Sequence, residues 1–155
     1  MSGLDLLGGL NRAVLLFVLL SASVSDLKRN TIPNRLLLAA LGVRLVLFGA
    51  ELQAGSWDLR RFQEDLLAMC LLAVFSAADI FLLKKAIGMG DLKLMAVMEL
   101  FLGSRLFGTA LLSSLLLAGL GCGLLLAFGQ RERRDKIPLA PFFLSGTLLS
   151  LLLSG

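Results

Sequence analysis

The sequence predicts an all-α integral membrane protein, built as one bundle of six transmembrane helices. Hydrophobic residues make up 57% of its 155 residues, above the roughly 45–50% that is usual in soluble domains. The apolar residues also gather in runs near the length that a membrane-spanning helix needs, about 20 residues. Charged or turn-forming segments separate these runs. We therefore expect a single transmembrane domain over residues 1–155.

Six apolar segments account for the expected helices. The apolar stretch Leu92–Phe128 is divided in two, because one helix of that length would reach about 55 Å, beyond a hydrocarbon core of about 30 Å. Gly103–Arg105 and Gly108 provide the turn. The expected spans are Leu6–Val24, Leu36–Ala50, Leu66–Leu83, Leu92–Phe107, Thr109–Phe128 and Ile137–Leu153. A short loop, Gly88–Asp91, is expected before the fourth span.

Lys and Arg in the short loops predict the orientation, because these residues are enriched on the cytoplasmic side. Ten of them fall on one side of the expected bundle and four on the other. The ten are Lys28, Arg29, Arg35, Lys84, Lys85, Lys93, Arg131, Arg133, Arg134 and Lys136, and the four are Arg12, Arg60, Arg61 and Arg105. We therefore expect the first side to face the cytoplasm and both termini to lie outside. Arg44, within the second span, either reaches toward the nearer surface or pairs inside the bundle.

The first apolar segment has a second interpretation, as a cleaved signal peptide. Arg12 precedes the apolar run Ala13–Leu20 and the small residues Ser21–Ser23, an order that such peptides show. The residues before Arg12 are themselves apolar and include Asp5, which differs from a positively charged amino-terminal region. Cleavage would also remove the helix that leads to Asp26, so we retain the segment as the first span.

The composition excludes several kinds of chemistry. The chain contains no histidine, which removes Ser-His and Cys-His nucleophiles and most transition-metal sites. Cys70 and Cys122 lie far apart and form no CxxC motif, so no zinc site is expected. The net charge is +4, but the basic residues are separated by apolar spans and form no continuous basic surface. We therefore expect the lipid bilayer as a partner and not nucleic acid. Carboxylate chemistry remains for hydrolysis, with no metal or cofactor.

Two aspartates stand at the ends of expected spans. Asp26 follows the first span, within Ser25–Asn34, and Asp91 begins the fourth, within Gly88–Leu94. A carboxylate at membrane depth is costly, so its presence indicates a function. Two neighbouring carboxyl groups share one proton, so that one takes a proton from water while the other donates to a peptide carbonyl. The structural alternatives are Asp91 as a helix N-cap and Asp26 as a solvated residue beside basic neighbours.

Five further residues are candidates for substrate binding or for support of the site. Gly88 and Gly90 permit positive φ angles and the close approach of a substrate strand. Lys93 either orients the aspartates or the substrate, or anchors its helix at the interface. Asp79 either forms an ion pair with neighbouring basic residues or contacts the substrate. Pro138 either shapes the start of the last span or lines the site.

Three motifs of the chain resemble those of the type IV prepilin peptidases, which are membrane aspartic proteases of the GxGD type. They are Asp26 followed by Thr31–Leu36, the segment Gly88–Leu94, and Lys136–Phe142 followed by Gly146. The resemblance covers nearly the whole chain. It implies that Asp26 and Asp91 are the catalytic pair, and that the substrates are prepilins or pseudopilins with a short basic leader. It also implies cleavage at the cytoplasmic face of the bacterial plasma (inner) membrane.

The chain departs from the larger members of that family. Those members carry an additional cytoplasmic segment, often with a zinc-binding CxxC pair, and also methylate the new amino terminus. This chain has only Lys28–Arg35 between its first two expected helices. We therefore expect a peptidase without methyltransferase activity, similar to the short branch that serves tight-adherence pili. Glu99 stands where family members often have glycine, and its effect on the aspartates is left open.

Two other functions remain as alternatives. One is a related GxGD intramembrane protease such as presenilin or signal peptide peptidase, although those chains are longer and lack the Ile-Pro-Asn motif. The other is a non-enzymatic transport or assembly protein that uses Asp26, Asp79 and Asp91 as ion or proton ligands. A genomic neighbour with a basic leader, a glycine before the cleavage point and an apolar helix would favour the peptidase.

Overall fold

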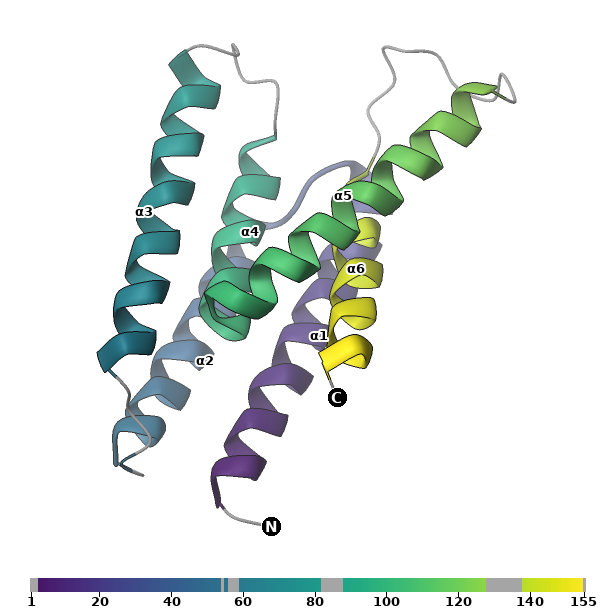
Figure 1. The fold of residues 1–155 in the computed structure, drawn as a ribbon. Coiled ribbons are helices and arrows are strands. Elements are labelled where there is room, and N and C mark those ends of the chain that lie inside the picture. The colour runs from purple at the N-terminus through teal and green to yellow at the C-terminus, as the bar shows by residue number, and fades with distance from the viewer. Residues whose placement is uncertain (1–2, 54, 56–58, 82–87, 128–137, 155) are drawn as a thin grey trace.

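The computed structural model describes residues 3–53, 55, 59–81, 88–127 and 138–154. These residues form helices joined by short connections, and none of them lies in a strand (Figure 1). The helices are α1 (Gly3–Arg29), α2 (Asn34–Gln53), α3 (Leu59–Phe81), α4 (Met89–Leu102), α5 (Ser104–Ala127) and α6 (Ala140–Ser154). The expected all-α class is thereby confirmed for the part of the chain that the structure describes.

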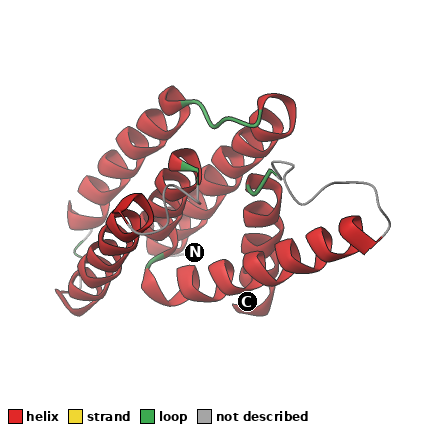
Figure 2. Ribbon diagram, turned by 90° about the horizontal axis from the view of Figure 1, so that it is seen from above, coloured by secondary structure: helices red, strands yellow, loops and turns green. Residues whose placement is uncertain are grey.

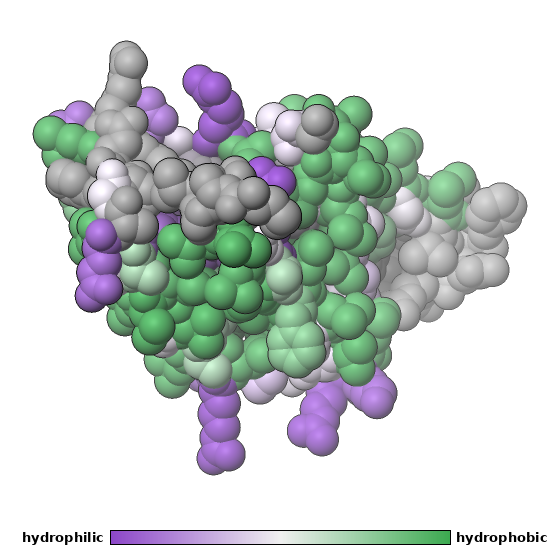
Figure 3. Space-filling view, turned by 90° about the horizontal axis from the view of Figure 1, so that it is seen from below, coloured by the Kyte–Doolittle hydropathy of each residue, from purple (hydrophilic) through white to green (hydrophobic). Residues whose placement is uncertain are grey.

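Three described helical segments are long and apolar enough to cross a membrane, namely Leu6–Arg29, Asn34–Gln53 and Ser104–Leu124. A shorter apolar helix covers Ala140–Ser154. Apolar side chains also cover much of the face drawn in Figure 3, as expected for a surface that meets lipid instead of water. These features support a membrane protein, while the crossing of the membrane by six helices stays a prediction.

A tight connection reverses the chain between α1 and α2. Asn30 adopts a left-handed conformation with a φ of 49°, which asparagine tolerates better than most residues. Its N–H donates a hydrogen bond of 2.8 Å to the carbonyl oxygen of Asp26, and the hydroxyl of Ser25 donates one of 2.9 Å to the carbonyl oxygen of Thr31. The connection is therefore held against the last turn of α1, which contains Asp26.

Two boundaries of α4 differ from the prediction. The helix begins at Met89, so that only Gly88 of the expected Gly88–Asp91 loop precedes it. It ends at Leu102, because Gly103 adopts a φ of 74° and donates its N–H to the carbonyl oxygen of Glu99 at 2.8 Å. The expected end at Phe107 is therefore wrong, and so is the turn at Gly108, which lies inside α5.

The length of α4 sets it apart from the candidate spans. It has 14 residues, which correspond to about 21 Å of helix, less than a hydrocarbon core of about 30 Å. Most of its residues after the first turn are buried, including Leu94, Met98 and Phe101. It contacts α1, α2, α3 and α5, so it forms the centre of the bundle.

The most extensive contact between two helices joins α5 and α6. A Cβ atom at Gly146 would overlap the side chain and backbone of Ser114. Ser113 donates its hydroxyl to the carbonyl oxygen of Gly146 at 3.0 Å, and the hydroxyls of Thr109 and Ser150 lie 2.6 Å apart. Small and polar residues at such a crossing are typical of helices that pack in lipid. Figure 2 shows α5 crossing α6 and extending away from the other helices at its far end.

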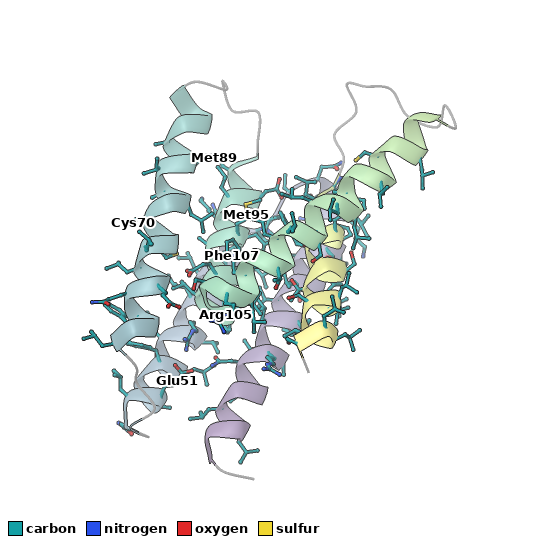
Figure 4. The ribbon with its side chains drawn as sticks, in the orientation of Figure 1. Glu51, Cys70, Met89, Met95, Arg105 and Phe107 are labelled. Atoms are coloured by element: carbon teal, nitrogen blue, oxygen red, sulfur yellow. The ribbon has the colours of Figure 1, made fainter. Side chains whose placement is uncertain are left out.

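A polar cluster joins α1, α2 and α4 at the end of the bundle where Figure 4 labels Glu51. Arg44 donates from Nε to the carbonyl oxygen of Leu100 at 2.7 Å, and its Nη1 lies 3.1 Å from Oε1 of Glu51. The same oxygen accepts a hydrogen bond of 2.6 Å from the side-chain amide of Asn11. Of the two alternatives for Arg44, the structure shows pairing inside the bundle. The cluster supplies a donor to one of the last carbonyls of α4, which lack partners within the helix.

Candidate active site

Asp26 and Asp91 line the same pocket, which has a volume of about 340 Å³. It lies at the end of the bundle where α1 ends and α4 begins (Figure 1). We call it the aspartate pocket. Its lining residues are Asp26, Asn30, Thr31, Ile32, Asn34, Gly88, Met89, Gly90, Asp91 and Lys93. The two motifs that the sequence analysis singled out separately therefore meet in one place.

Asp26 is buried in the last turns of α1, with 6% of its surface exposed. Its Oδ2 accepts a hydrogen bond of 3.1 Å from the backbone N–H of Ala140. Ala140 is the first residue of α6, and the first N–H groups of a helix have no acceptor within the helix and carry its positive dipole end. Asp26 is therefore not the solvated residue of the structural alternative, and its carboxyl group joins the last turn of α1 to the start of α6.

Sequence reasoning missed Ala140. An alanine side chain offers no chemistry, and the donor here is a backbone N–H. The available signal was the pair Pro138 and Pro141 around it, because prolines gather in the first turn of helices and the free N–H groups lie there too. Pro138 itself is half-buried and precedes α6, and it is not among the described residues that line the aspartate pocket.

Asp91 lies in the first turn of α4, before the apolar part of that helix and outside the three candidate spans. Its N–H donates a hydrogen bond of 3.0 Å to the carbonyl oxygen of Gly88. Gly88 occupies the N-cap position, so Asp91 is not the N-cap residue. Burial, and second the negative charge of Asp26, raise the pKa of the Asp91 carboxyl from 3.8 to about 6. The two carboxyl groups thus influence each other electrostatically.

The two glycines of the motif allow close packing around Asp91. A Cβ atom at Gly88 would stand 3.0 Å from Oδ2 of Asp91, and one at Gly90 would stand 3.3 Å from Cβ of Ile32. The expectation of positive φ angles is not met, because Gly88 has a φ of −65° and Gly90 is not among the glycines with positive φ. The close contact of Gly90 with Ile32 brings the start of α4 against the connection that follows Asp26.

Lys93 and Asn34 form a polar contact at the rim of the aspartate pocket. Nζ of Lys93 donates to Oδ1 of Asn34 at 3.1 Å. The contact joins α4 to the first residue of α2, so Lys93 helps hold the two motifs together. The structure describes no hydrogen bond between Lys93 and Asp91.

Two other acidic residues of the sequence analysis lie elsewhere. Glu99 is fully buried and follows Asp91 by two turns on α4, so both occupy one face of the helix. Asp79 lies in α3, but its side chain is outside the described part of the chain, as are Lys84 and Lys85. The proposed ion pair of Asp79 therefore stays a prediction. Among the described residues no group of three His, Cys, Asp or Glu side chains is arranged to hold a metal ion.

Comparison with known proteins gives one family. The model of the type IV leader peptidase family matches residues 13–128, which is more than half of the chain and includes both aspartates. No curated protein matches, and no solved structure does. The match ends before α6, so the residue that donates to Asp26 lies beyond it.

Proposed function

Because the chain belongs to the type IV leader peptidase family, we propose that it is a membrane aspartic endopeptidase with Asp26 and Asp91 as its catalytic pair. It removes the basic leader peptide from type IV prepilins or pseudopilins. The observation that carries this proposal is the meeting of Asp26 and Asp91 in the aspartate pocket. The family match favours this function over a GxGD protease of another family and over a non-enzymatic transport or assembly protein.

The two aspartates take different roles. Asp91, whose pKa is raised, serves as the acid, and Asp26, which accepts a hydrogen bond from the backbone N–H of Ala140, serves as the base. A water oxygen attacks the carbonyl carbon of the scissile bond while Asp26 takes a proton from that water and Asp91 donates its proton to the carbonyl oxygen. The C–N bond then breaks. The amine leaves with the proton from Asp26, and the hydroxyl of the intermediate returns its proton to Asp91.

The aspartate pocket faces the cytoplasm in this proposal. Lys28 and Arg29 lie in the last turn of α1 and Lys93 lies near the start of α4, at the same end as the pocket. Arg12 lies toward the other end of α1, and Arg105 lies at the start of α5, at the end away from Met89 in Figure 4. Over the whole sequence ten basic residues are expected on the side of the pocket and four on the other, and this bias supports a cytoplasmic position. The bacterial plasma membrane is the corresponding location.

Leader removal in cells tests the proposal. A prepilin with a basic leader is co-expressed with the wild type, with Asp26→Asn or with Asp91→Asn, and processing is followed by gel shift. We expect the wild type to remove the leader and both variants to leave it, at equal levels of folded protein in the membrane. Near-normal processing by either variant would show that the pair is assigned wrongly. A silent wild type on several prepilins would overturn the proposed function.

A further inference from the structure

The aspartate pocket adjoins a groove that runs along α3, beside α4 near the pocket and beside α2 at its far end. A second hollow, of about 190 Å³, shares Met89 and Lys93 with the aspartate pocket. A third, of about 220 Å³, shares Met69 with the second, reaches Leu100 near the end of α4, and is bounded on its other side by residues Leu41–Phe48 of α2. Figures 1 and 2 show α3 at the edge of the bundle, beside α4. We call the two adjoining hollows the α3–α4 groove.

Two walls of the groove are stripes at helical spacing, and α2 forms a third wall at the far hollow. On α4 the stripe is Met89, Lys93, Ala96 and Leu100, and on α3 it is Phe62, Leu66, Met69 and Ala73. Each stripe spans eleven residue steps and hence about 16 Å, or three turns of helix. An occupant must therefore be elongated and extend over about three turns.

The surface of the groove is apolar after its mouth. Lys93 is the charged residue near the aspartates, and Arg44 lines the far end, where it is paired with Glu51. Between them the described lining consists of aliphatic, methionine and phenylalanine side chains. The small side chains of Ala73 on α3 and Ala96 on α4 leave space between these two helices. The flexible thioethers of Met69 and Met89 can adapt to different partners.

The connection to the aspartate pocket identifies the occupant. A peptide bond held between Asp26 and Asp91 lies beside Met89 and Lys93, which also form the mouth of the groove. Of the two segments that flank this bond in a prepilin, the apolar helix matches the apolar lining of the groove, and the basic leader does not. The volumes of the two hollows fit side chains from one face of a helix, not a whole helix. A lipid chain is also elongated and apolar, but nothing would align it with the aspartates.

We propose that the α3–α4 groove binds one face of the apolar helix that follows the scissile bond in the substrate. This inference rests on the proposed function. It assigns substrate selection to Ala73, Ala96 and Met69, none of which takes part in the chemistry. Substrates with a bulky apolar face of about three turns after the cleavage point are bound, and peptides that lack this helix lose the contribution of the groove.

Site-specific photo-crosslinking tests the position of the substrate. A photoreactive phenylalanine analogue replaces Ala73, Ala96 or, as a control, Leu120, which lies on α5 and is 66% exposed. The prepilin is present in the same membranes. We expect adducts with the prepilin from positions 73 and 96 and not from position 120. Adducts with lipid alone, or equal prepilin adducts from all three positions, would overturn the proposal.

Kinetics of variants that fill the groove test its role. For Ala73→Phe and Ala96→Phe we expect KM for the full prepilin to rise by about tenfold, the scale of a lost apolar contact, with little change in kcat. For a short leader peptide that lacks the apolar helix, we expect the KM of both variants to stay within about twofold of the wild-type value. The matched control, Leu120→Phe, changes neither value. If the wild type cleaves the prepilin and both groove variants show the same KM, the groove does not bind the substrate helix. The assignment of the protein as a peptidase would still stand.

Discussion

The carboxylate of Asp26 accepts a hydrogen bond of 3.1 Å from the backbone N–H of Ala140. This contact joins the last turn of α1 to the first residue of α6. It gives a physical role to the third sequence motif, which lies beyond the range of the family match. Asp91 lies in the first turn of its own helix, α4, and is only partly buried. The two carboxyl groups therefore occupy different environments in one pocket, which is the arrangement that an acid and a base require.

The pH dependence of cleavage reports the proton on Asp91. Its pKa is raised to about 6, and the mechanism needs this carboxyl in its protonated form. We expect the single-turnover rate to fall as the pH rises above about 6, by up to tenfold for each pH unit. Rates measured with saturating enzyme in detergent, with folding checked at each pH, provide the test. A rate that increases over the same range would contradict the role of Asp91 as the acid.

Thermal unfolding of Asp91→Asn reports the same group independently of activity. A carboxyl group whose pKa is raised in the folded state stabilises the folded state at pH values below about 4. This contribution to the free energy of unfolding is lost as the pH rises through about 6. Asparagine cannot lose a proton, so the variant does not undergo this loss of stability as the pH rises. We expect its melting temperature above pH 7 to exceed that of the wild type by about 2–4 °C, allowing for solvent screening of a half-exposed group. The difference should shrink toward about pH 4, and a variant less stable than the wild type above pH 7 would contradict it.

The glycines of the α4 motif are expected to control geometry at the pocket. Gly88→Ala places a methyl group against Oδ2 of Asp91, and Gly90→Ala places one against Ile32. A displacement of about 1 Å in a catalytic group lowers rates by about 10²-fold, and we expect losses toward that size in prepilin processing. Gly119→Ala is the control, because nothing lies within 4 Å of its Cβ position. Normal processing by both pocket variants would show that the tight contacts are unimportant.

The crossing of α5 and α6 is expected to tolerate no side chain at Gly146. A Cβ atom there overlaps Ser114, including its backbone, so the two helices must separate. We expect Gly146→Ala to lower the free energy of unfolding by roughly 1–3 kcal/mol, as overpacking does. Unfolding curves in detergent measure the change, and Gly123→Ala, with open space around its Cβ position, serves as the matched control. Equal stability of the two variants would contradict the close crossing.

Several features of the fold and the site followed from the sequence. The apolar runs predicted helices, and the positions of Asp26 and Asp91 at the ends of those runs predicted residues near one end of the bundle. The structure places both in one pocket. The reason is general, because hydrophobic segments and the cost of a carboxylate at membrane depth are visible in residue types alone.

Other features depend on contacts that residue types do not reveal. Gly103 and Gly108 are equivalent as possible turns in the sequence, and only the φ of 74° at Gly103 distinguishes them. Ala140 acts through its backbone, which every residue possesses. The contact of Gly90 with Ile32 involves two distant segments, and its closeness follows from the packing of α4 against the connection after α1.

Kinetics of the single and double aspartate variants test most directly whether Asp26 and Asp91 act as one unit. Cleavage rates of a purified prepilin are measured for the wild type, Asp26→Asn, Asp91→Asn and the double variant, each checked for folding. We expect each single substitution to lower the rate by about 10²–10⁴-fold, and the double substitution to lower it no further, because residues that act together are not additive. Losses that multiply in the double variant would contradict a shared catalytic pair.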